Sequence, residues 1–174
     1  MLATVLIDGF NLLHAVILKG RDRAGWWRSD RQLQVVALAA QLAERAERGS
    51  LELPALASAS PPVLLELPLH VVFDRRPGSS EAACRSGPLQ APVDPARVLV
   101  HHAASADDWI VAECQSRRRA TRVVVVSADR ALIDRARHHG ASRLSPWAFA
   151  ALCLSPEPTE PGAGEPGGAG GRHP

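Results

Sequence analysis

Short apolar runs that lead into acidic residues recur along this sequence. Runs of this length, rich in β-branched residues and closed by turn residues, are typical of buried parallel strands. They predict four main strands. The strands and the acids that follow them are residues 3–7 with Asp8, residues 67–73 with Asp74, residues 97–101 with Asp107 and Asp108, and residues 122–126 with Asp129.

Helical spacing of apolar residues fills the stretches between these runs. The clearest helix begins with an N-cap at Ser29 or Asp30 and ends at Gly49, a residue type that commonly terminates helices. Strands that alternate with helices indicate an α/β three-layer sandwich with a mostly parallel central sheet of four to five strands. Further helices are predicted at 11–18, 105–118, 129–139 and 147–154, with a short edge strand at 142–144.

The length of 174 residues suits one domain, which we place at residues 1–154. This domain contains a proline-rich loop at 50–62 and a long irregular loop at 75–95. Residues 155–174 are rich in Pro, Gly and Glu and have too few apolar residues to bury a core, so we predict a disordered tail.

Composition indicates the cellular compartment of the protein but not its activity. The formal net charge of +2 does not by itself point to nucleic acid. The three cysteines are scattered and form no CxxC pair, which argues against a disulfide framework and a structural zinc site. No apolar stretch approaches the roughly 18 residues of a membrane span, and no signal peptide is evident. These features predict a cytoplasmic protein with no membrane partner.

The acids indicate a metal site. Parallel strands end at the same edge of a sheet, so Asp8, Asp74 and Asp129 are expected there with the 107–108 pair. Clustered carboxylates without His or Cys ligands favour Mg²⁺ or Mn²⁺, and such ions support phosphodiester hydrolysis. Neighbours on a helix point about 100° apart, so one of Asp107 and Asp108 is the expected ligand and the other a cap or outer acid.

Each of these candidates also has a purely structural interpretation. An aspartate after a strand is a common helix N-cap or turn residue. Asn11 and Ser127 either support the acidic site or cap helices, and basic side chains near the strands either contact RNA phosphates or lie in solvent. Three of the basic candidates, Arg117, Arg118 and Arg119, lie at a predicted helix C-terminus, where positive charge stabilises the helix whether or not it binds a ligand. The basic candidates are Arg75 and Arg76, and Arg117, Arg118 and Arg119.

Four segments together resemble the YacP-like branch of the NYN domains, within the PIN-like nuclease superfamily. The resemblance spans roughly residues 3–152 and implies a PIN-like sandwich, a divalent-metal site and RNA endonuclease activity, linked in some members to ribosomes or mRNA turnover. It matches Asp8, Asp74, Asp107 and Asp129 to the acidic site positions, with Asn11 and Ser127 beside them. The segments are VLIDGFNLLH (5–14), HVVFD (70–74), ASADDWIV (104–111) and VVVVSADR (123–130) followed by HGA (139–141).

The sequence departs from the family pattern in two places. The usual Thr and Glu before the A-D block are replaced by residues 102–105, and Phe10 stands where Tyr is common.

From the acids and the resemblance together, we expect a metal-dependent RNA endonuclease, with a catalytically weak RNA- or ribosome-binding module as the alternative. A dehalogenase-type phosphatase would need an acid at Phe10, and a nucleotide-binding fold would need more glycines around Gly9.

Overall fold

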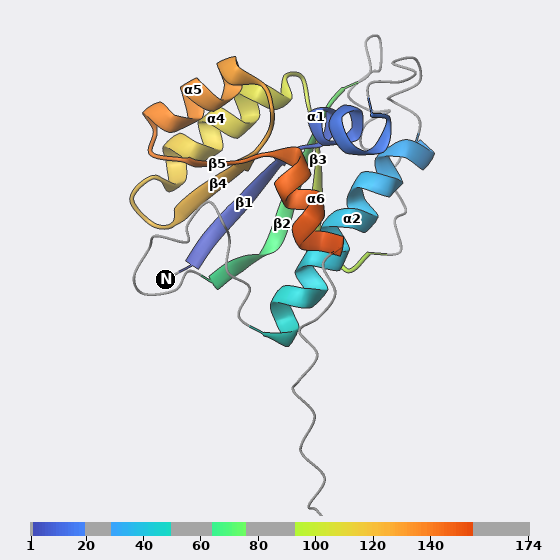
Figure 1. Cartoon of the computed structure of the whole chain (residues 1–174). Coiled ribbons are helices and arrows are strands. Elements are labelled where there is room, and N and C mark those ends of the chain that lie inside the picture. Colours follow the sequence, from blue (N-terminus) through green and yellow to red (C-terminus); the bar gives the residue numbers. More distant parts are fainter. Residues whose placement is uncertain (1, 20–28, 50–63, 76–92, 155–174) are drawn as a thin grey trace, which may run out of the picture.

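The computed structural model describes residues 2–19, 29–49, 64–75 and 93–154, which form a single sheet with helices on both faces (Figure 1). The predicted proline-rich loop, most of the predicted 75–95 loop and the predicted tail lie outside the described residues. So do Arg76, Trp26 and Trp27.

The sheet has five strands, and every neighbouring pair is parallel. The spatial order is β3-β2-β1-β4-β5, so the first strand of the chain lies in the middle. This confirms the predicted parallel sheet and its predicted fifth, short edge strand. The strands are β1 Leu2–Asp8, β2 Leu64–Asp74, β3 Val98–Ala103, β4 Arg122–Val126 and β5 Ser142–Leu144.

The helices alternate with the strands close to the predicted bounds, with two differences. The helix Ser29–Arg48 already contains Ser29 and Asp30, so neither is the N-cap that the sequence predicts. The first helix begins at Gly9 rather than at residue 11, and its second half is a π-helical turn. No helix in the described part of the chain has the length and apolar character needed to cross a membrane. The helices are α1 Gly9–Leu12, the π-turn η1 Leu13–Ile17, α2 Ser29–Arg48, α4 Ala106–Arg117, α5 Arg130–His138 and α6 Pro146–Leu154.

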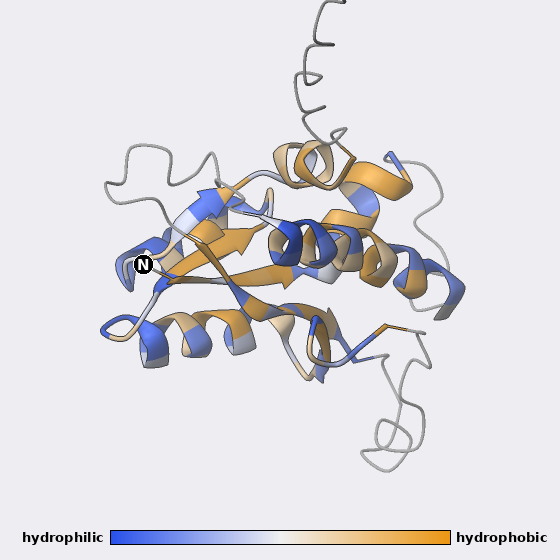
Figure 2. Ribbon diagram, turned by 90° about the horizontal axis from the view of Figure 1, so that it is seen from below, coloured by the Kyte–Doolittle hydropathy of each residue, from blue (hydrophilic) through white to orange (hydrophobic). Residues whose placement is uncertain are grey.

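Alternation along the strands divides the core into two layers. In β1, Val5 and Ile7 pack with α2, η1 and α6, whereas Leu6 packs with α4 and α5. Figure 2 shows the mainly hydrophobic strands between these two layers of helices. Because side chains alternate with a period of two, Asp8 has the same parity as Leu6 and belongs to the α4/α5 face.

Strand β2 begins earlier than predicted, at Leu64, although Pro68 lies inside it. The pairing accommodates this proline through an irregular register, because Thr4 pairs with Glu66 but Leu6 pairs with His70. Proline has no N–H to donate to the ladder, so an irregularity at this point is the expected solution. Beyond it the pairing is regular up to Asp8, which fixes the height at which the strand ends lie.

The two described cysteines, Cys114 and Cys153, are free and buried in opposite layers of the core. Burial raises the pKa of Cys114 to about 11 and that of Cys153 to about 12. Both thiols therefore remain protonated at neutral pH and serve as packing residues, as the sequence predicts. Cys84 lies outside the described residues.

Candidate active site at the carboxyl edge of the sheet

The strand order places a switch point between β1 and β4. The chain builds β1, β2 and β3 outward in one direction and then returns to the other side of β1 for β4 and β5. In open α/β sheets, ligands bind outside the carboxyl ends of the strands at such a point. Strands β1 and β4 lie side by side (Figure 1). Asp8 ends β1 and Ser127 follows β4, and a hydrogen bond joins their side chains at this position.

Both carboxylate oxygens of Asp8 accept hydrogen bonds, and the residue is only 5% exposed. Oδ1 accepts a hydrogen bond from the backbone N–H of Asn11 at 3.0 Å, and Oδ2 accepts one from the Ser127 hydroxyl at 3.0 Å. Burial raises the pKa of Asp8 to about 7, against the lowering effect of these hydrogen bonds, and the charges of Asp107 and Asp74 raise it further. The native fold thus buries a carboxylate whose charge it does not fully compensate.

Asn11 and Ser127 connect the two turns that flank the switch point. The side-chain Oδ1 of Asn11 accepts from the backbone N–H of Ala128 at 2.8 Å. The fully buried Ser127 hydroxyl also accepts from the N–H of Asp129 at 3.0 Å. Asp8 itself is the N-cap of α1, so Asn11 is not the cap that one sequence interpretation assigned to it. The Ser127 side chain thus holds Asp8 and Asp129, and the Asn11 side chain holds the turn at Ala128 between them.

Gly9 brings the ends of β1 and β2 close together. A Cβ added at Gly9 would lie 2.4 Å from Cε1 of Phe73, whose ring is fully buried. Only a residue without a side chain allows this approach. Since Phe73 directly precedes Asp74, the contact fixes the position of Asp74 relative to Asp8.

Asp74 and Asp129 each use one oxygen in a structural role. Oδ1 of Asp74 accepts from the N–H of Ala106, at the start of α4, at 2.8 Å. Oδ1 of Asp129 accepts from the N–H groups of Ala131 at 2.7 Å and Leu132 at 3.2 Å, which caps α5. The structural interpretation of these acids is therefore correct for one oxygen of each, and it fixes both carboxylates at the carboxyl edge.

The structure separates Asp107 from Asp108. Partial burial raises the pKa of Asp107, and the nearby charges of Asp129 and Asp74 raise it further. Asp108 is exposed, and its Oδ1 lies 2.6 Å from Nη2 of Arg135; this hydrogen bond lowers its pKa. Asp107 therefore lies in the field of the other acids, whereas Asp108 is paired on the outside of α4.

The four acids influence each other electrostatically without forming a compact ligand cluster. Within the described ranges, no three His, Cys, Asp or Glu side chains are gathered closely enough to hold a metal ion. The donors at this edge are carboxylate, amide and hydroxyl oxygens, which suit a hard cation such as Mg²⁺ or Mn²⁺. Burial raises the pKa values of Asp8 and Asp107, and the neighbouring acids raise them further; a bound cation would favour the charged form of both.

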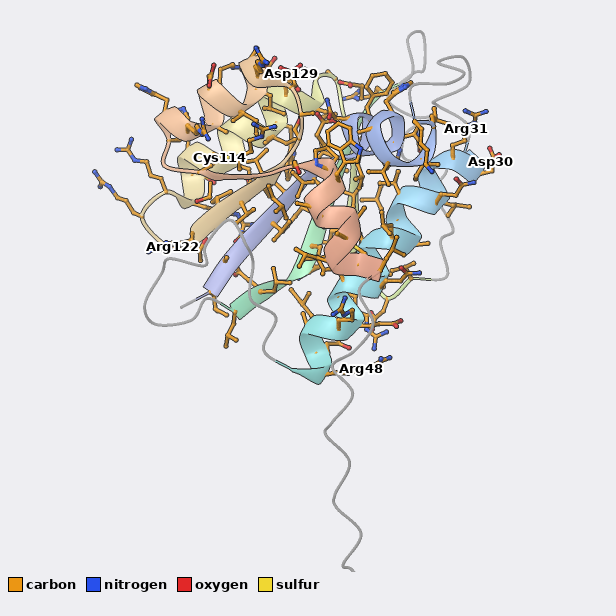
Figure 3. All side chains as sticks on the ribbon, in the orientation of Figure 1. Asp30, Arg31, Arg48, Cys114, Arg122 and Asp129 are labelled. Carbon is orange, nitrogen blue, oxygen red and sulfur yellow. The ribbon has the colours of Figure 1, made fainter. Side chains whose placement is uncertain are left out.

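The predicted basic residues lie at different edges of the sheet. Arg117 ends α4 at the amino edge, where it pairs with Glu113 and lies 3.8 Å from Glu66. The exposed Arg118 and Arg119 follow it there, away from Asp8. Figure 3 shows the same separation, with Arg122 at the start of β4 far from Asp129 beyond its end.

Arg75 is the described basic candidate at the carboxyl edge. Its backbone N–H donates to the carbonyl of Ala103 at 2.7 Å, which extends the pairing of β2 and β3 by one residue. Its side-chain Nε is buried and has no hydrogen-bond partner among the described residues. Arg75 is thus a cation whose backbone is fixed directly after Asp74 by pairing with β3.

The histidines of β2 and β3 are buried or partly buried and contact other side chains. Nδ1 of His70 lies 3.0 Å from Nε2 of His101, and both rings pack near Trp109 of α4. His102 points to the other layer, 3.3 Å from Gln32. Burial lowers the pKa of all three histidines, which keeps them neutral in the core at neutral pH.

A groove beside Asn11 was missed by the sequence interpretation. It has a volume of about 640 Å³ and is lined by Asn11, His14, Ala15, Val16, Lys19 and Trp147. The signal was present in the chain order, because Trp147 follows the predicted edge strand and so belongs at the carboxyl edge with the acids.

A family model for the YacP-like NYN domain matches residues 69–155, which is half of the chain. The chain belongs to this family. The match includes Asp74, Asp107 and Asp129, and it begins after Asp8 and Asn11. Membership in this family of nuclease-like domains indicates a nuclease-type function related to RNA.

A solved structure supports the fold assignment. The chain is similar to the crystal structure of a point mutant of Rae1 (YacP) from Bacillus subtilis, with a TM-score of 0.50 and 18% sequence identity. The similarity covers 88% of this chain and 75% of that chain. It confirms the predicted YacP-like α/β fold. No functionally curated protein is significantly similar to this chain.

Proposed function

We propose that this protein is a divalent-metal-dependent RNA endonuclease that hydrolyses phosphodiester bonds of messenger or ribosome-associated RNA. The observation that carries the proposal is Asp8, a buried carboxylate at the switch point with both oxygens fixed. Burial raises the pKa of Asp8 to about 7 and the charges of Asp107 and Asp74 raise it further, while its two hydrogen-bond donors, the Asn11 backbone and the Ser127 hydroxyl, are neutral. Strongly perturbed groups of this kind are enriched at functional sites.

The residues that would hold Mg²⁺ or Mn²⁺ are Asp8, Asp74, Asp107 and Asp129. They follow four parallel strands and lie at one edge, and each except Asp8 is at least partly open to solvent. We leave Asp108 out because Arg135 already neutralises it. When bound, the cation would supply stabilisation of negative charge on the attacked phosphate and activation of a water molecule.

The other residues have supporting roles. Ser127 and Asn11 keep Asp8 and the 127–129 turn in a fixed arrangement, so the acids need not reorganise when charge develops. Arg75 holds a positive charge beside Asp74 and would contact a phosphate on one side of the bond to be cut.

A catalytically weak RNA- or ribosome-binding module is the alternative. One observation favours it, namely that within the described ranges the acids do not form a three-ligand cluster. Both functions require RNA binding, but only the nuclease requires a divalent cation and the acids for cutting.

Cleavage of a mixed pool of single-stranded and structured RNA by the full chain tests the proposal. The wild type is compared with Asp8→Asn, Asp129→Asn and the matched control Asp134→Asn, an exposed acid on α5. We expect cutting that requires Mg²⁺ or Mn²⁺, that is lost in both site variants and that the control retains. A folded wild type that binds RNA without cutting it would establish the binding module instead.

A further inference from the structure

The groove beside Asn11 is lined by residues of α1, η1 and α6, on the layer of helices opposite to α4 and α5, and Asn11 connects it to Asp8 through its backbone N–H. We propose that it binds one unpaired RNA base next to the bond that is cut, with the base stacked on Trp147. The inference rests on the proposed function, because it assigns a substrate subsite to the same enzyme.

Trp147 lies at the carboxyl edge for a topological reason. Strand β5 is parallel to β4 and ends at Leu144, and Ser145 caps the following helix by accepting from the N–H of Ala148 at 3.1 Å. Trp147 is therefore in the first turn of α6, which contacts η1. Its side chain is 60% exposed, although Phe149 in the same helix is fully buried.

The π-turn forms the other wall of the groove. The N–H of Leu18 donates to the carbonyl of Leu13 at 2.9 Å, a span of five residues that widens the helix at this point. Single π-turns inside helices occur frequently at functional sites. His14, Ala15 and Val16 of this turn line the groove together with Trp147.

The two ends of the groove differ in charge and match the two ends of a nucleotide. Asn11 stands at one end and is bonded to Ala128 in the turn that holds Asp129. Lys19, the single lysine of the sequence, is exposed at the lining of the groove. An aromatic face with a nearby cation is the arrangement that binds a base together with its backbone phosphate.

The continuity with the acidic centre identifies an RNA base rather than a peptide as the occupant. A base that stacks on Trp147 with its own phosphate at Lys19 places the neighbouring phosphate towards Asn11, whose backbone N–H donates to Asp8. Bases within a duplex are already stacked and paired, so the groove selects unpaired nucleotides at the cleavage position. Stacking on an aromatic ring tolerates any base, which predicts little sequence preference at this position.

Binding of a labelled single-stranded RNA to the full chain tests the subsite. Affinity is measured by fluorescence anisotropy in EDTA, with a series of the same RNA in which each nucleotide in turn is abasic. We expect Trp147→Ala to weaken binding about tenfold and Trp147→Phe to retain most of the affinity. The matched control is Leu154→Ala, which is 67% exposed on the same helix and does not line the groove.

The abasic series shows whether Trp147 contacts a base. In the wild type, one abasic position is expected to weaken binding about tenfold, and in Trp147→Ala the same position is expected to have no further effect. Lys19→Gln provides a second variant, with a salt dependence reduced by about one phosphate contact. Arg137→Ala, an exposed cation of α5 outside the groove, is expected to leave it unchanged.

The outcomes separate the groove from the nuclease. Additive effects of the abasic position and Trp147→Ala, or unchanged RNA affinity in both Trp147→Ala and Lys19→Gln, would overturn the subsite while leaving the proposed nuclease intact. Coupled effects in a protein that binds but does not cut RNA would support the subsite and overturn the nuclease. A wild type that binds no RNA and does not cut it with Mg²⁺ or Mn²⁺ would overturn both.

Discussion

The two edges of the sheet differ in how their charged side chains are compensated. At the amino edge, Arg117 pairs with Glu113, lies near Glu66 and donates to the Thr4 hydroxyl at 3.2 Å. At the carboxyl edge, Asp8 is buried and receives only neutral donors, from the Asn11 backbone and the Ser127 hydroxyl. Acids are therefore neutralised at one edge and accumulate at the other.

The difference shows which polar groups hold the fold together and which are kept for function. Hydrogen bonds and ion pairs at the amino edge join β1, β2 and α4 with compensated charge. The acidic edge costs folding free energy, because desolvation and neighbouring acids disfavour the charged form of Asp8. Proteins retain such a cost where a ligand or substrate compensates it.

The largest expected effect is on the rate of RNA cleavage, compared between carboxylate-to-amide substitutions at the two edges of the sheet. Asp74→Asn should lower the RNA cleavage rate by at least about a thousandfold, about 4 kcal/mol of transition-state stabilisation, because a metal-facing carboxylate is lost. Glu113→Gln should leave the rate within about threefold, because it removes a charge only at the amino edge. Single-turnover cleavage measures both. Equal losses would mean that the edges do not differ in function.

The next effect is on stability without divalent cations. The pKa of Asp8 is raised from 3.8 to about 7 in the native state, so the unfolded chain releases this proton at lower pH. Stability is therefore complete below about pH 4 and falls as the pH rises towards 7, by roughly 4 kcal/mol from this group. Chemical denaturation at several pH values should show the fall in the wild type and its absence in Asp8→Asn. A slope that is the same in both proteins would contradict the assignment.

Backbone packing at the carboxyl edge gives a smaller effect. Gly9→Ala should destabilise the protein by about 2 kcal/mol, because its Cβ must displace the buried Phe73 ring. The control is Gly49→Ala at the end of α2, where a Cβ would meet nothing within 4 Å. Thermal denaturation of both variants tests this, and a Gly9→Ala protein as stable as the control would show that Phe73 yields without cost.

The smallest effect is expected at the amino edge. Arg117→Ala should cost about 1 kcal/mol, because it leaves Glu113 and Glu66 without their cation at a partly exposed position. The exposed Arg118→Ala should cost less than about 0.5 kcal/mol. Urea unfolding of the two variants compares them. A loss of cleavage activity in Arg117→Ala with intact stability would instead place RNA at this edge.

The strands and the acids that follow them could be predicted, because a buried parallel strand appears in the sequence as a short continuous run of apolar residues. Residues 122–126 and 142–144 were predicted with the bounds that the structure shows. The start of β2 at Leu64 was not, because Pro68 suggests a break and only the irregular pairing with β1 accommodates it. The π-turn could not be predicted from the sequence either, because the spacing of hydrophobic residues does not distinguish it from an ordinary helical turn.

The position of the acidic site was predictable from strand ends, but its internal arrangement was not. Whether Asp107 or Asp108 faces the site depends on Arg135, which lies 27 residues after Asp108 and reaches it only in the fold. The exposure of Trp147 likewise depends on how α6 packs against η1. Such choices are made by contacts between distant segments, which a local pattern does not contain.

The central claim is that Asp8 carries an uncompensated charge at a cation site. NMR titration of its carboxyl carbon, without divalent cations and then with saturating Mg²⁺, tests this directly. We predict a pKa of about 7 in the metal-free protein and a fall to about 5 or below with Mg²⁺, because a bound cation favours the carboxylate. A pKa near 4 without metal, or one that Mg²⁺ leaves unchanged, would contradict the account.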